Sequence, residues 1–351
     1  MRVIRVFLSL SLLSAGFVIA PSLPQAADTS RTSAHPATAP SLPGLLFRTG
    51  PPQMPASETL HTLGAANSPE RESASIFSPY YGRGPIAGFV SQGRSVHDQP
   101  PTVNLESSQG YLDPAPGGMD VQYAWTLPGG KGENTKIIDI EFDWNLNHHD
   151  LLSAASRLFI YQPAADGDPT DDIPHGTAVL GELVAADDGF GVTGIANLAQ
   201  LGLIDPAVSN TTLKLADAIN MAASVLDPGD VMLIEQQMLG PRYNPMTGDG
   251  LVPNELDSTV YSAIKGATNR GIIVVEPASN GADNLDDSIY SGAFDRRIHD
   301  SGAILVGAGY PPQSKKNADR SALAESDYGS RLDVQGWGRG ITTCGFGDVQ
   351  L

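Results

Sequence analysis

Three residues that could share one hydrolytic reaction stand far apart in this sequence. Asp139 ends an apolar stretch, His175 begins the run His-Gly-Thr, and Asn280 follows a second apolar stretch. Hydrolysis of an acyl bond near neutral pH needs a base that takes a proton from the nucleophile, an acid that orients this base, and donors for the negative oxygen that forms. We therefore expect His175 as the base, Asp139 as the orienting acid and Asn280 as an oxyanion donor.

The sequence around these residues resembles the subtilisin-like serine proteases. The strand of Asp139 is followed by the turn H-x-D-L at 148–151, and His175 lies in the pattern H-G-T-x-x-x-G. Asn280 stands where the family has Ala-Gly-Asn. In one departure, the usual Asp-Thr-Gly or Asp-Ser-Gly is Asp-Ile-Glu, which ends at Glu141. In another, Ala178 replaces the second histidine of the His-Gly-Thr motif.

The resemblance implies a serine endopeptidase that acts on a polypeptide substrate and works as a monomer. Met238, Leu239 and Gly240 resemble the family's edge strand, whose backbone pairs with an extended peptide. These residues could also simply end a strand, and Asn280 could instead stabilise a turn before Gly281. No cofactor and no metal is expected from the sequence itself, and calcium is expected by family analogy only.

The nucleophile of the family is not found. The 351 residues contain no Gly-Thr-Ser, and the segment 328–351 resembles only the family's approach to that motif. We therefore expect a fragment that hydrolyses no peptide bond as written. Two alternatives stay open. One is a non-catalytic peptide-binding relative of the same fold, and the other is an unrelated doubly wound binding protein whose motifs match by chance.

Apolar strands alternate with amphipathic helices from about residue 118 onward. Strands are expected at 136–140, 201–204, 231–236, 271–275 and 303–306, and helical stripes run over 215–226 and 256–267. This pattern predicts an α/β fold with a doubly wound, mostly parallel sheet and helices on both faces, C-terminally incomplete. Because ligands bind at the carboxyl ends of such strands, the three candidate residues are expected to meet there.

The first 117 residues differ in composition and pattern from the rest of the chain. Residues 1–27 carry Arg2, Arg5 and a short apolar run, which is typical of a secretory signal peptide. The segment 28–117 is rich in proline and predicts a largely disordered prosegment or linker. We therefore expect domain 118–351 to be secreted or periplasmic, with no membrane contact after signal removal; a retained anchor is the alternative.

The charged and metal-ligating residues exclude several classes of function. A net charge of −18 argues against nucleic acid as a partner, and one cysteine, Cys344, rules out an internal disulfide framework. Cys344 is expected to be a small buried side chain. His148 and His149 lack the spacing of a zinc helix and are expected in a solvated turn. The strand-associated carboxylates Glu235 and Glu276 need partners, which the sequence does not identify.

Overall fold

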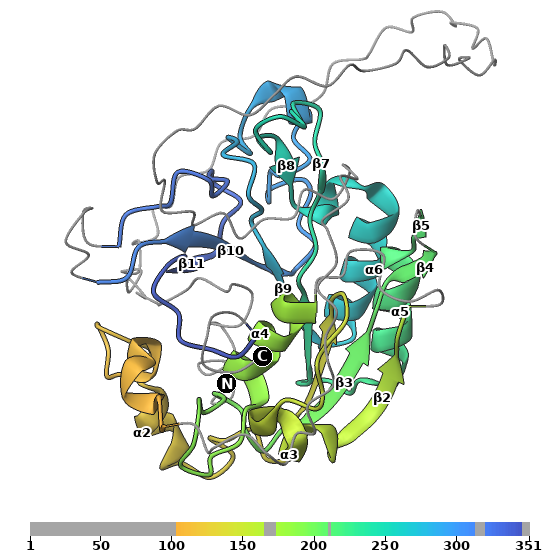
Figure 1. Cartoon of the computed structure of the whole chain (residues 1–351). Coiled ribbons are helices and arrows are strands. Elements are labelled where there is room, and N and C mark those ends of the chain that lie inside the picture. Colours follow the sequence, from red (N-terminus) through yellow and green to blue (C-terminus); the bar gives the residue numbers. More distant parts are fainter. Residues whose placement is uncertain (1–102, 165–172, 210–211, 313–319, 346–351) are drawn as a thin grey trace, which may run out of the picture. The chain divides into compact units, whose positions relative to one another are not determined.

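A parallel β-sheet forms the centre of the molecule. The structure is a computed structural model that describes residues 103–164, 173–209, 212–312 and 320–345 (Figure 1). The predicted signal peptide and most of the segment 28–117 lie outside these residues. The sheet has seven strands in the order β11-β10-β9-β6-β1-β3-β2, and every pairing within it is parallel. The strands are β1 Lys136–Ile140, β2 Leu158–Gln162, β3 Gln200–Ile204, β6 Val231–Ile234, β9 Ile273–Pro277, β10 Ile304–Gly309 and β11 Val334–Trp337.

Three longer helices cover the two faces of this sheet. They are α4 Ile173–Val184, α5 Leu215–Val225 and α6 Ser258–Asn269. Helices α5 and α6 lie side by side, and Ile219 and Ile264 from them share one apolar core with β-strand residues (Figure 1). Helix α4 contributes Leu180 and Leu183 to the core on the other face. The predicted α/β class, with a parallel sheet and helices on both faces, is confirmed.

Shorter elements fill the connections. They are the turns of 3-10 helix η2 Glu106–Ser108, η3 Gly110–Leu112, η4 His149–Leu151, η5 Asn254–Leu256 and η6 Ser288–Tyr290, the helices α2 Val121–Trp125 and α3 Leu152–Ala155, and the strands β4 Ala207–Ser209, β5 Thr212–Leu213, β7 Met238–Leu239 and β8 Leu251–Val252. Strands β7 and β8 pair antiparallel in a separate two-stranded sheet.

The order of strands creates a natural place for a site. Strand β1 lies between β3 and β6; the chain first builds β2 and β3 on one side of β1 and then continues with β6 on the other. Connections that leave in opposite directions open a crevice beyond the carboxyl ends of the two central strands. Side chains that follow β1 and β6 directly, such as Glu141 and Glu235, are therefore placed at this crevice.

Part of the segment 28–117 packs against the domain. Tyr111 and Leu112 are buried in the same core as α4, and Tyr111 meets Trp337 edge to face at 6.3 Å between ring centroids. The backbone N–H of Leu105 donates to the carbonyl of Gly191 at 2.6 Å. The packed unit thus includes residues before 118, whereas the rest of this segment lies outside the described residues.

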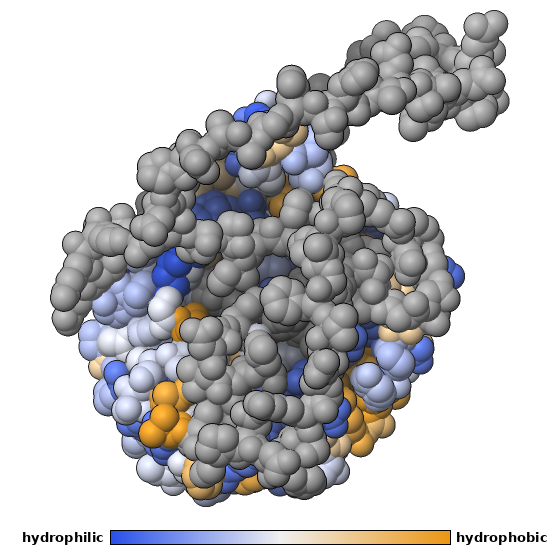
Figure 2. Space-filling view, in the orientation of Figure 1, coloured by the Kyte–Doolittle hydropathy of each residue, from blue (hydrophilic) through white to orange (hydrophobic). Residues whose placement is uncertain are grey.

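The surface mixes polar and apolar residues. Figure 2 shows hydrophilic and hydrophobic patches interspersed on the visible face of the described part. Within that part of the chain, no helix combines the length and the apolar character needed to cross a membrane.

Candidate active site

A histidine and a glutamate form the centre of the candidate site. His175 lies in the first turn of α4, and its Nδ1 is 2.5 Å from Oε2 of Glu141, the residue that follows β1. Glu141 is 2% exposed, and its Oε1 accepts a hydrogen bond from the N–H of Phe142 at 3.0 Å. A carboxylate held in this way fixes the orientation of the imidazole and stabilises its protonated form. About a quarter of the His175 side chain, 26%, stays exposed, so solutes can reach it.

The structure places Glu141 beside His175 Nδ1, where the sequence predicted Asp139. The orienting role of Asp139 itself stays a prediction. Asp139 is fully buried; its Oδ2 accepts from Trp144 Nε1 at 2.9 Å, and its Oδ1 has no hydrogen-bond partner among the described residues. Burial and the nearby charge of Glu141 raise the pKa of Asp139 well above its usual range. Its neutral form is a weaker partner for an imidazole, so any further part of Asp139 in the reaction stays a prediction.

Two more buried carboxyl groups surround the pair. Glu235 follows β6, and Glu182 lies two turns after His175 on α4. Burial raises the pKa of both groups well above the ordinary value, and in Glu235 the charge of Glu141 adds to the effect. Ligand atoms of Glu141, His175 and Glu235 all lie within 4.8 Å of one another. The carboxyl group of Glu235 beside β6 therefore lies close to both Glu141 and His175.

Gly176 and Thr177, which follow His175, lie where the segment after β1 packs against the start of α4. A side chain at Gly176 would place its Cβ 2.8 Å from Trp144 Cδ1 and 2.9 Å from the carbonyl oxygen of Phe142. The hydroxyl of Thr177 accepts a hydrogen bond from the N–H of Asn145 at 2.9 Å. The segment after β1 can therefore lie directly against the start of α4, which brings Glu141 to His175.

Asn280 is engaged by a residue that the sequence did not single out. Its backbone N–H and its side-chain amide both donate to Oε1 of Gln237, at 3.0 and 3.3 Å. Gln237 follows β6 and Asn280 follows β9, and these strands are neighbours in the sheet. The two side chains therefore meet at the carboxyl edge. The oxyanion role of Asn280 stays a prediction.

The predicted substrate-binding residues belong to the small antiparallel sheet. Met238 and Leu239 form β7 and pair with Val252 and Leu251 of β8, and the N–H of Gly240 donates to the carbonyl of Gly250 at 2.8 Å. Met238, Leu239 and Gly240 are half-buried. Their place directly after Gln237 puts them next to the candidate site along the chain, and peptide binding by them stays a prediction.

Glu276 belongs to a different network. It is fully buried on β9, where burial and the charge of Glu255 raise its pKa well above the ordinary value. The neighbouring Arg331 is also buried and donates from Nε to Oε1 of Glu255 at 2.5 Å. This ion pair ties η5 to the segment before β11, and Glu276 lies close to it.

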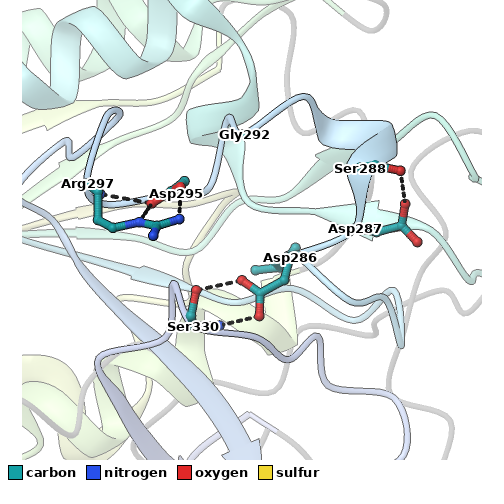
Figure 3. Close-up of a pocket in the computed structure, with 8 residues that line it drawn as sticks. Asp286, Asp287, Ser288, Gly292, Asp295, Arg297 and Ser330 are labelled. Atoms are coloured by element: carbon teal, nitrogen blue, oxygen red, sulfur yellow. Dashed lines mark hydrogen bonds and ion pairs between the residues drawn. The ribbon is translucent and has the colours of Figure 1, made fainter.

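The hollow shown in Figure 3 lies away from these residues. It measures about 290 Å³ and is lined by side chains from 285–297 and by Ser330, none of them a predicted site residue. Asp286 accepts hydrogen bonds from the hydroxyl and N–H of Ser330, and Asp295 is paired with Arg297. These acids are already satisfied, so we assign this hollow no part in the chemistry.

No family model matches the chain, and several solved structures are similar to it. A protease from Pseudoalteromonas arctica is 20% identical, with a TM-score of 0.47 over 67% of this chain and 71% of that one. The subtilisin-like protease Apa1 from an Antarctic Pseudoalteromonas is 18% identical, with a TM-score of 0.44 over 62% and 44%. The leader-peptide-processing serine protease EpiP of Staphylococcus aureus is 19% identical, with a TM-score of 0.44 over 67% and 58%. Each of these three proteins is a protease to which part of this chain is similar.

Proposed function

We propose that this chain is the main part of the catalytic domain of an exported subtilisin-like serine endopeptidase. The observation that carries the proposal is the 2.5 Å contact between His175 Nδ1 and Glu141 at the switch point of a parallel sheet. A carboxylate on one ring nitrogen leaves the other nitrogen as the base of a hydrolytic site. Glu141 takes the place that we first gave to Asp139.

In this proposal each residue has one task. Nε2 of His175 takes the proton of an attacking serine hydroxyl and later returns it to the leaving amine. Glu141 keeps Nδ1 protonated and stabilises the imidazolium that forms. Asn280 donates its amide to the oxygen of the tetrahedral intermediate. The substrate is an extended polypeptide, held alongside Met238, Leu239 and Gly240, and no cofactor takes part.

No nucleophilic serine is assigned in the 351 residues. Because the 351 residues contain no Gly-Thr-Ser, we propose that the chain as given does not acylate. The same observation favours one second function, a peptide-binding protein that keeps the cleft but has no nucleophile. In both cases the protein is exported and works as a monomer.

Reading the coding sequence beyond Leu351 and expressing the longer protein distinguishes the two. If an in-frame Gly-Thr-Ser follows, a fluorophosphonate probe should label that serine, and His175→Ala should abolish labelling. Glu141→Gln should slow peptide hydrolysis by roughly 10³- to 10⁴-fold, as loss of the orienting acid does in a serine protease. The exposed Glu133 provides a matched control, because Glu133→Gln should leave the rate unchanged.

The 351-residue chain should stay unlabelled under the same conditions. Labelling of this chain at any serine would show that the nucleophile has been missed. A stop codon without Gly-Thr-Ser codons in any frame, together with saturable binding of extended peptides, would instead favour the peptide-binding protein. Full activity of the longer protein with Glu141→Gln would contradict the role of Glu141.

A further inference from the structure

A second cluster of ligand-type side chains lies outside the candidate active site. It consists of His148, Asp150 and Cys344, which are 3%, 2% and 3% exposed. One ligand atom from each of the three lies within 4.8 Å of the other two. His148 was expected in a solvated turn, and its burial corrects that expectation. The prediction that Cys344 is buried is confirmed.

The spacing in this cluster suits a tetrahedral ion. The sulfur of Cys344 is 3.8 Å from Oδ2 of Asp150. A zinc ion bound to one thiolate and one carboxylate oxygen at its usual bond lengths separates these two atoms by about 3.6 Å. The two side chains therefore already stand at nearly the distance that a shared ion requires.

His148 adds an independent sign of an absent partner. The N–H of Asp150 donates to His148 Nδ1 at 3.2 Å, which places the proton of the neutral ring on Nε2. Nε2 is buried and has no hydrogen-bond partner in the described part of the chain. A buried polar atom without a partner is costly, and an ion bound at Nε2 would be such a partner.

We propose that His148, Asp150 and Cys344 bind one soft divalent cation, for which Zn²⁺ is the probe. The mixture of sulfur, nitrogen and oxygen ligands selects such an ion over calcium, which takes oxygen ligands. The site joins the turn of η4 to the segment that follows β11. It is separate from the His175–Glu141 pair and does not depend on the proposed protease function.

The protons and charges of the binding step balance. The Cys344 thiol loses its proton to solvent as the S–Zn bond forms. The ring proton of His148 moves from Nε2 to Nδ1, and the long contact with the N–H of Asp150 is given up. The dication, the thiolate and the Asp150 carboxylate sum to zero, so no net charge is buried. Asp150 Oδ1 also lies 3.3 Å from Nδ1 of the partly exposed His149.

The experiment measures metal binding by the full chain after treatment with a chelator. We expect one Zn²⁺ per chain in competition with a chromophoric chelator, release of one proton, and a higher melting temperature. Co²⁺ should give the near-ultraviolet charge-transfer band of a thiolate ligand. Absence of this band in the unmutated protein would overturn the proposal, whatever the variants do.

Variants locate the ligands. Cys344→Ser and His148→Gln should each weaken Zn²⁺ binding by roughly 100-fold, since even partners outside the ligand shell contribute about 10- to 100-fold. His299→Gln is the control, because His299 contacts Ala293 and Tyr261 and none of the three ligands, and it should bind as the unmutated protein does. Equal affinity of Cys344→Ser and the unmutated protein, loss of binding in His299→Gln alone, or equal stabilisation of Cys344→Ser by Ca²⁺ and Zn²⁺ would each refute the site.

Discussion

Two acids of one strand compete for a single imidazole. Side chains of a β-strand alternate, so Asp139 and Glu141 point to the same side of β1. Asp139 is buried beneath Trp144, whereas Glu141 stands beyond the last residue of the strand and reaches His175. The longer side chain at the strand end therefore contacts the imidazole nitrogen that was predicted for the shorter one.

The first prediction separates these two acids. Glu141→Gln should remove the low-field proton signal of His175 Nδ1 and lower the midpoint of the imidazole titration by about 1 pH unit or more, because a carboxylate favours the imidazolium. Asp139→Asn should change both far less, since burial raises the pKa of Asp139 and disfavours its charged form. Nuclear magnetic resonance of ¹⁵N-labelled protein measures both quantities. A larger effect of Asp139→Asn would return the orienting role to Asp139.

The same residues show which contacts the sequence could not predict. The sequence led us to Asp139 and gave Glu141 only as a departure from the motif, because the contact of Glu141 with His175 depends on tertiary structure. Gln237 was missed because no motif marks an amide that accepts from a distant asparagine. His148 was assigned to solvent, since nothing local shows that Cys344 packs against the same turn.

At the scale of elements, the strands buried on both sides were easiest to predict. The range 136–140 agrees with β1 residue for residue, and the stripes of α5 and α6 both face the core. Strands β2 and β11 were missed. They are the two edges of the sheet, so they bury less and do not show a continuous apolar run.

Helix α4 provides the second prediction. A side chain at Gly181 would put its Cβ 2.8 Å from the backbone N and 2.9 Å from the sulfur of Cys344, whereas Gly266 on α6 has no atom within 4 Å. Alanine has the higher helix propensity, so Gly266→Ala should stabilise the protein by about 0.5–1 kcal/mol. Gly181→Ala should destabilise it by about 1–3 kcal/mol, because the overpacking outweighs that gain.

Urea unfolding of the two variants beside the unmutated protein tests this comparison. The substitution is identical and both sites are helical, so the difference isolates the contact between α4 and the segment at 343–344. Equal stabilisation by both alanines would mean that this segment does not pack on α4 in solution.

At the scale of the whole molecule, buried acids set the pH dependence of stability. Asp139, Glu182, Glu235, Glu276 and Asp327 all have raised pKa values, and burial is the largest cause in each. Each keeps its proton in the folded protein at a pH where the unfolded chain has lost it. The folded state then binds more protons, so the free energy of unfolding falls as pH rises from about 4.

The third prediction concerns Asp327 and the pH range over which this residue affects stability. Burial raises its pKa to about 8, so its share of the loss extends from about pH 4 to about pH 8 at no more than about 1.4 kcal/mol per unit. Asp327→Asn should therefore gain stability relative to the unmutated protein between pH 5 and pH 8, as measured by urea unfolding at both. The exposed Asp217 supplies the control, and Asp217→Asn should leave the slope unchanged. Parallel slopes for all three proteins would contradict this account.

The paired hydrogen bonds from Asn280 to Gln237 have a consequence for what the crevice can select. Both donors already serve a neutral amide oxygen. An incoming peptide carbonyl is an acceptor of the same kind, so exchanging one for the other yields little free energy. A negatively charged oxygen accepts about twice as strongly and wins the exchange. If Asn280 acts as proposed, its contact with Gln237 means that binding the uncharged substrate carbonyl gains little free energy. Binding the negative oxygen that forms during the reaction gains more.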